Sequence, residues 1–124
     1  IMSTIKANTL LHSDGTTTNP PAIPALDKRM AKAWVEFSGT GTIAVNNGYN
    51  VSSLTDHYTG NYSVNFTTTL ASAYYATSLN HGGASVRGND IIVSMGTSAV
   101  RVETRGETDN EADSPIVSVI VFAP

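Results

Sequence analysis

Hydrophobic and polar residues alternate with a period of two along much of the chain after residue 30. The clearest case is the run YSVNFTT at residues 62–68, in which Tyr62, Val64 and Phe66 alternate with polar residues. The run AKAWVEF at residues 31–37 alternates in the same way, with Trp34 on the more polar side. Successive side chains of a strand point to opposite faces, so this pattern predicts half-buried β-strands.

Turn residues separate these runs from further segments of the same kind. Glycines follow the first strand, Asn47-Gly48 is a pair typical of tight hairpin turns, and Thr59-Gly60 precedes residues 62–68. Further strands are expected at residues 42–46, 49–54, 74–79, 91–95, 99–104 and 115–122. The glycine-rich residues 80–85 are expected to end the strand before them.

The last segment, residues 115–122, has apolar residues at both odd and even positions. Such a strand is expected to be buried on both faces. In a small sandwich one face normally meets water, so we expect the surplus apolar surface to lie between subunits. The residues predicted for this subunit interface are Trp34, Val117, Val119 and Val121.

The first 30 residues have a different character. Residues 3–11 alternate weakly and predict a short exposed strand, and Ser13-Asp14-Gly15 is a turn signal. The prolines at positions 20, 21 and 24 keep the following stretch extended. We therefore predict an N-terminal arm and linker over residues 1–30 and one β-domain over residues 31–124; a disordered leader is the alternative.

About eight strands at short intervals predict an all-β fold, an antiparallel β-sandwich or jelly roll. The composition agrees, because only 14% of the 124 residues are charged and the polar surface is rich in Ser, Thr and Asn. The net charge of -3 with dispersed cations argues against nucleic-acid binding. No apolar run approaches the ~18 residues that span a bilayer, so no membrane insertion is expected.

Metal and cofactor chemistry finds little support in the sequence. The chain has no cysteine, and its three histidines lack the spacing of a metal pair. An acidic segment could offer oxygen ligands to calcium, but it lacks the order of an EF-hand, and charge runs are usually solvated. Its residues are Glu107, Asp109, Glu111 and Asp113. We expect no metal and no cofactor.

No catalytic motif stands out either. The chain has neither a nucleophile elbow nor a phosphate-binding loop followed by a helix. A pair of carboxylates formed by Asp56 and Glu103 stays open as a glycosidase alternative. A domain of this size has little room for both a core and a cleft, so we expect no enzyme.

The segment of residues 80–90 is the best candidate for contact with a ligand or receptor. Its glycines allow close approach, and its polar side chains offer the hydrogen bonds that sugar recognition needs. Exposed tyrosines could stack on sugar rings, although most tyrosines pack in cores or interfaces. The candidate contact residues are His81, Arg87, Asn89, Asp90 and Tyr58, with Tyr49, Tyr74 and Tyr75 as further tyrosines.

Three runs together resemble a known family. They read KAWVEFSGTGTIAV at residues 32–45, NVSSLTD at residues 50–56 and TGNYSVNFT at residues 59–67. This stretch resembles a segment that recurs in tail-fibre and other tail-associated proteins of bacteriophages and prophages, where it opens a β-rich domain. The opening of the chain is similar to that of tail proteins as well, whereas nearly everything after Leu79 departs from the family.

The resemblance implies a location in the virion after synthesis in the host cytoplasm. It implies a homotrimer that docks to other tail proteins through its N-terminal arm and touches a host-surface receptor or glycan with distal loops. Two alternatives remain: a purely structural accessory protein of the head or neck, and a tail enzyme that degrades polysaccharide.

Overall fold

The computed structural model describes residues 3–16, 23–83 and 89–124 and shows an all-β chain with eight antiparallel strands in two sheets. Ahead of the strands, Pro24–Asp27 forms a single helical turn, α1, with proline at its start. The strands are β1 (Ala33–Ser38), β2 (Ala44–Tyr49), β3 (Val51–Tyr58), β4 (Asn61–Phe66), β5 (Ala76–Gly82), β6 (Ile91–Met95), β7 (Ala99–Glu103) and β8 (Ile116–Phe122).

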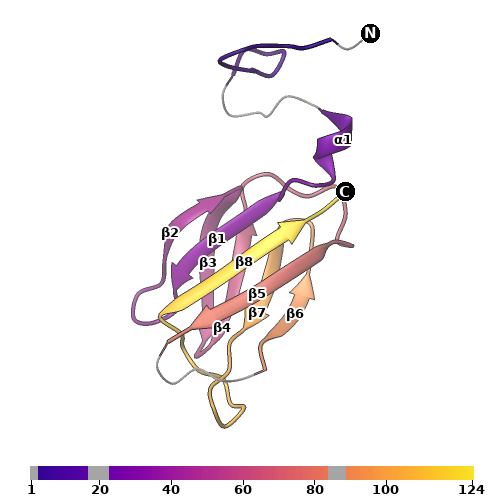
Figure 1. Cartoon of the computed structure of the whole chain (residues 1–124). Coiled ribbons are helices and arrows are strands. Elements are labelled where there is room, and N and C mark those ends of the chain that lie inside the picture. The colour runs from indigo at the N-terminus through magenta and orange to yellow at the C-terminus, as the bar shows by residue number, and fades with distance from the viewer. Residues whose placement is uncertain (1–2, 17–22, 84–88) are drawn as a thin grey trace.

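The strands divide equally between the two sheets. Sheet A has the order β2-β1-β8-β5, sheet B has the order β3-β4-β7-β6, and the sheets face each other (Figure 1). This arrangement confirms the predicted sandwich. The jelly-roll topology is not confirmed, because three pairs of consecutive strands, β1-β2, β3-β4 and β6-β7, are hairpins within one sheet.

The core lies between the central strands of the two sheets. Most of its buried residues come from alternate positions of β1, β4, β7 and β8, as the period-two pattern predicts, and Leu70 and Ala123 join them from outside the strands. Phe37 and Tyr62 meet edge to face across the sandwich, with ring centroids 5.3 Å apart. The pattern of residues 62–68 is therefore confirmed, since Tyr62, Val64 and Phe66 all point inward.

One prediction about β8 is wrong. Val117, Val119 and Val121 are at most 1% exposed and belong to the core, so they cannot contact another subunit. The outer face of β8 carries Ile116, Ile120 and Phe122 instead, all of them exposed. Because both sets of residues are apolar, the strand's own pattern does not say which set faces the other sheet.

Strand pairing also overrides two predicted turns. Gly48 lies within β2 opposite Val35, and the left-handed corner that leads to β3 is at Asn50, with φ of 55°. The Asn50 side chain donates to Lys32 O and Thr68 O, which ties the corner to both sheets. β5 continues through Gly82, because β8 supplies ladder partners as far as Ile116.

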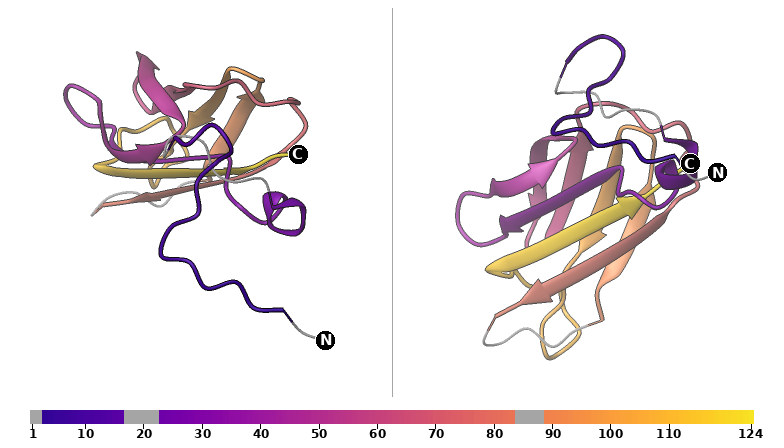
Figure 2. Two further views of the ribbon diagram at one scale, coloured as in Figure 1. Left: turned by 90° about the horizontal axis from the view of Figure 1, so that it is seen from above. Right: turned by 45° about the horizontal axis from the view of Figure 1, so that its top comes forward.

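The N-terminal segment contains no strand within residues 3–16, so the predicted exposed strand is wrong. The predicted turn is present, since Gly15 N donates to His12 O over 2.8 Å. Figures 1 and 2 show this segment running away from the sheets, and Ile5 is 86% exposed. A docking role for the arm stays a prediction. Among the described residues, no helix has the length and apolarity to cross a membrane.

Candidate functional site

Across β3, β4 and β7 the outer face of sheet B is polar and is held by side-chain hydrogen bonds. Residues that alternate with the core positions of β4 and β7 point to this face. On β4, Asn65 donates to Ser53 and Thr55 of β3, and Ser63 lies 2.8 Å from His57 Nε2. These contacts fix the hydroxyl and amide groups across two neighbouring strands. We call this surface the polar face.

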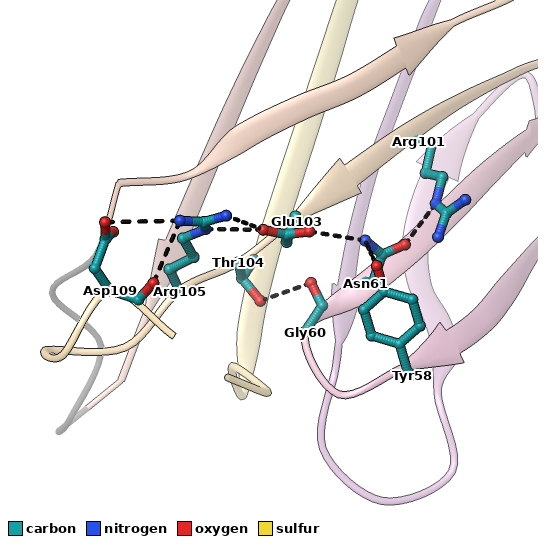
Figure 3. Close-up of polar contacts among 8 residues, drawn as sticks. All are labelled: Tyr58, Gly60, Asn61, Arg101, Glu103, Thr104, Arg105 and Asp109. Atoms are coloured by element: carbon teal, nitrogen blue, oxygen red, sulfur yellow. Dashed lines mark hydrogen bonds and ion pairs between the residues drawn. The ribbon is translucent and has the colours of Figure 1, made fainter. Parts of the chain in front are cut away.

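One end of the polar face carries a chain of polar contacts that joins β4, β7 and the segment after β7 (Figure 3). Arg101 Nε donates to Asn61 Oδ1 over 2.6 Å, and Asn61 Nδ2 donates to Glu103 Oε2 over 3.0 Å. Glu103 Oε1 accepts from Arg105 Nε over 2.8 Å, and Arg105 Nη1 donates to the carbonyl of Asp109 over 3.3 Å. We call Arg101, Asn61, Glu103, Arg105 and Asp109 the polar chain.

Only one orientation of the Asn61 side-chain amide satisfies the hydrogen bonds of the polar chain. Arg101 can only donate and ionised Glu103 can only accept, so the Asn61 amide must turn its oxygen to the arginine. Asn61 is fully buried and Glu103 is 6% exposed. The buried Glu103 carboxylate is compensated by its ion pair with Arg105. The hydrogen bond to Glu103 also raises the pKa of the Arg105 guanidinium. The amide is therefore locked in place.

Tyr58 completes this end of the face. Asn61 Nδ2 also lies 3.2 Å from the Tyr58 hydroxyl, and Arg101 Cζ lies 5.8 Å from the centre of the Tyr58 ring. At this distance the π-electrons of the Tyr58 ring attract the positively charged guanidinium. Tyr58 is one of the predicted contact residues, and it remains 51% exposed.

The other predicted contact residues lie elsewhere. His81 at the end of β5 and Asp90 before β6 come together, with Nδ1 and Oδ1 2.6 Å apart. Their side chains are only 8% and 17% exposed, so they face each other and offer little surface to a ligand. Burial raises the pKa of the Asp90 carboxyl, against the opposing effect of His81. Asn89 is exposed, and Arg87 lies outside the described residues.

The acidic segment is folded rather than free. Asp113 Oδ1 accepts from Gly60 N and lies 2.7 Å from the Tyr62 hydroxyl, and Arg105 pairs with Asp109. Burial raises the pKa of Tyr62, and the hydrogen bond and negative charge of Asp113 raise it further. The phenol therefore stays protonated and can donate. Within the described ranges, no three His, Cys, Asp or Glu side chains gather as a metal site requires.

The two carboxylates left open as a glycosidase pair do not meet. Asp56 lies opposite Tyr62 and Glu103 lies opposite Asn61, and these two positions of β4 face opposite sides of sheet B. Glu103 is also committed to Arg105 and Asn61. The strand register therefore keeps the two carboxylates from acting together on one glycosidic bond.

No protein-family model, curated protein or solved structure matches this chain. The polar chain offers hydrogen-bond groups, and among the residues that the structure describes no acidic side chain pairs with its Arg101.

Sequence reasoning missed Asn61, Arg101, Glu103 and Arg105 as members of one site. A signal was present for three of them: Arg101, Glu103 and Arg105 are spaced by two, so they share one face of an extended segment. The position of Asn61 beside them depends on the pairing of β4 with β7, which no local pattern reveals.

Proposed function

We propose that this protein is a structural component of a bacteriophage or prophage tail that assembles as a homotrimer. In this proposal the N-terminal arm docks the protein to other tail proteins, and the polar face meets the host surface. The segment that resembles tail-associated proteins, residues 32–67, corresponds to β1 through β4 and includes strands of both sheets. The trimeric state is taken from that resemblance.

The observation that carries the self-assembly in this proposal is an apolar patch on the outer face of sheet A. Trp34 lies directly opposite Tyr49 on one side and Ile120 on the other, and Phe122 follows two positions along β8. These four side chains are 36–43% exposed on a sheet face where polar residues would be expected. Tyr49, Trp34, Ile120 and Phe122 are hereafter the apolar patch.

The chemistry of the apolar patch favours a second copy of this chain as its partner. Trp34, predicted as an interface residue, lies at its centre, and the patch spans β2, β1 and β8 without a charged side chain among its four members. Aromatic residues with aliphatic neighbours are typical of subunit interfaces. The opposite, polar face then remains free to contact other molecules.

Localisation to the virion is tested with an antibody raised against the recombinant protein. The antibody should label the tails of particles produced by the strain that encodes the gene, when the particles are viewed by immunogold electron microscopy. An antibody against a cytoplasmic enzyme of the same strain is the control. Label confined to the cell lysate, with unlabelled particles, would overturn the proposal.

Substitutions in the apolar patch should change the oligomeric state. We expect light scattering at micromolar concentration to give three times the 13.0 kDa monomer mass for the wild type. Trp34→Glu and Ile120→Lys should give monomers, because each places a charge in a desolvated interface. Thr69→Glu, at an exposed position outside the patch, is the matched control. A monomeric wild type, or charged variants that remain oligomeric, would contradict assembly through the patch.

A further inference from the structure

We propose that the polar face binds a saccharide that carries a carboxylate, with Arg101 holding the carboxylate and Tyr58 contacting the sugar ring. This inference rests on the proposed function, because it names the class of ligand that the polar face would meet on a host surface. It is carried by the geometry of Arg101, Tyr58 and Asn61 at the end of sheet B that Figure 3 shows.

The first observation is that the guanidinium of Arg101 is only partly used. Its Nε donates to Asn61, whereas neither terminal nitrogen has a hydrogen-bond partner among the residues that the structure describes. Within the same ranges no acidic side chain pairs with Arg101, although Arg105, four positions along the chain, is paired twice. A guanidinium with a free edge offers two parallel N–H groups, which match a planar carboxylate.

The second observation is that Arg101 is held before any ligand arrives. Asn61 is fully buried, its amide is oriented by Glu103, and Glu103 is anchored by Arg105. A buried polar chain of this kind contributes little net stability compared with apolar residues of similar size. It does fix the side chain at its exposed end, and a fixed donor loses less entropy when it binds.

The third observation is the exposed ring beside this cation. Tyr58 is half exposed, lies within cation-π distance of Arg101 and shares Asn61 with it through its hydroxyl. Tyrosine supplies a rigid, flat surface that covers C–H groups at low entropic cost. A sugar ring presents such C–H groups, and a carboxylate attached to that ring could reach the neighbouring guanidinium.

Neighbouring side chains offer hydrogen bonds to sugar hydroxyls. Ser63 lies directly opposite Arg101 on β4, and His57 reaches Ser63 from β3. Both side chains can donate and accept, as hydroxyl groups require. The site thus combines one cation, one aromatic ring and neutral hydrogen-bond groups on a single sheet face.

The charge of this site favours one carboxylate per sugar unit over a polyphosphate. Of the two arginines named on the polar face, Arg101 alone has no acidic partner in the described part of the chain, and the net charge of the whole sequence is -3. Strong binding to nucleic acid requires several cations that replace counterions along the phosphates. A single fixed guanidinium instead fits an isolated negative charge on an otherwise neutral ligand.

The test uses a tetrasaccharide of alternating glucuronate and N-acetylglucosamine as the probe. The uncharged tetrasaccharide of N-acetylglucosamine provides the sugar without the carboxylate, and inorganic phosphate provides an anion without the sugar. We expect the glucuronate probe to bind more tightly than either, measured by titration calorimetry with the full chain. Amide NMR shifts on binding should cluster on β3, β4 and β7.

Variants of Arg101 then test its role directly. Arg101→Gln should lower the affinity for the glucuronate probe about tenfold or more, because a charged hydrogen bond is lost. Arg29→Gln removes the same charge from an exposed residue before the sandwich and should leave the affinity unchanged. Arg101→Lys keeps the charge without the fork and should give an intermediate affinity. Tyr58→Leu should weaken binding without altering the charge. Thermal unfolding of each variant checks that it is folded.

Three outcomes would overturn this inference. They are the absence of glucuronate binding by the wild type at millimolar concentration, equal losses in Arg101→Gln and Arg29→Gln, and shifts confined to sheet A. Any of them can occur while the antibody still labels phage tails, which would leave the tail assignment in place. Conversely, binding that depends on Arg101 in a protein absent from particles would support the site and reject the tail assignment.

Discussion

Replacing Gly60 with alanine should prevent stable folding, whereas the same change at Gly41 should leave a folded protein. Both glycines have left-handed backbones, with φ of 71° and 67°. This conformation alone costs an alanine about 1–2 kcal/mol. At Gly60 an added Cβ would also lie 2.6 Å from Thr104 O and 2.7 Å from Ala112 N, whereas at Gly41 it meets open space. Backbone atoms cannot move aside as a flexible side chain can.

The close approach at Gly60 has a structural purpose. Gly60 O accepts from Thr104 N, and Gly60 N donates to Asp113, so the turn between β3 and β4 is packed against the loop that leads to β8. Asn61, the centre of the polar chain, is the next residue. Loss of this packing should therefore disturb the polar face as well as the core.

Urea unfolding followed by circular dichroism measures the two glycine variants side by side. We expect Gly41→Ala to unfold cooperatively at a slightly lower urea concentration than the wild type. Gly60→Ala should show little native signal without denaturant, or a midpoint far below that of Gly41→Ala. Equal midpoints would mean that the backbone near Thr104 and Ala112 can open to admit a methyl group.

The sequence predicts the strands well where one face of a strand is buried and the other is wet. In β4 the aromatic and aliphatic residues alternate with Ser63 and Asn65, and this alternation alone assigns the inward face correctly. In β8 both faces are apolar, so the pattern predicts a strand but leaves its facing undetermined. Pairing with the neighbouring strand β1 determines which face of β8 is buried, since Val119 pairs with Val35 and both lie in the core.

Turn residues predict the positions of turns less reliably, because their conformational preference is local and weak. Asn47-Gly48 has the composition of a hairpin turn, yet pairing with β1 across a bulge holds it in the strand. Likewise, Asn80 and Gly82 remain in β5 because β8 supplies their ladder partners. Long-range hydrogen bonds outweigh a turn propensity of this size, and a single sequence does not reveal them.

The candidate site depends on such long-range pairing more than the strands do. Tyr58 could be proposed from the sequence as an exposed aromatic residue near a turn. The role of Arg101 could not, because a charged residue at an outward strand position is ordinary. It becomes informative only when the register places it beside Asn61 of β4 and over Tyr58 of β3.

Replacing Tyr62 should lower the free energy of unfolding by amounts that separate its ring from its hydroxyl. The side chain is fully buried and packs edge to face with Phe37. Tyr62→Ala should cost about 3–5 kcal/mol, the range for removal of a large buried aromatic. Tyr62→Phe keeps the ring but removes the donor that lies 2.7 Å from Asp113, and should cost about 1–3 kcal/mol.

The Tyr62 hydroxyl has only one proton to share between its two acceptors. Gly39 O lies 3.1 Å away and Asp113 Oδ1 lies 2.7 Å away, so the shorter, charged contact takes the proton. Tyr62→Phe therefore leaves the Asp113 carboxylate with one donor fewer, while Gly60 N still holds it in place. A double-mutant cycle of Tyr62→Phe with Asp113→Asn, measured by urea unfolding, should give a coupling of about 1 kcal/mol or more. Tyr74→Phe, at an exposed position outside the apolar patch, should change stability by less than about 0.5 kcal/mol. A coupling near zero would mean that burial of the ring alone, and not its bond to Asp113, fixes the acidic segment against the sandwich.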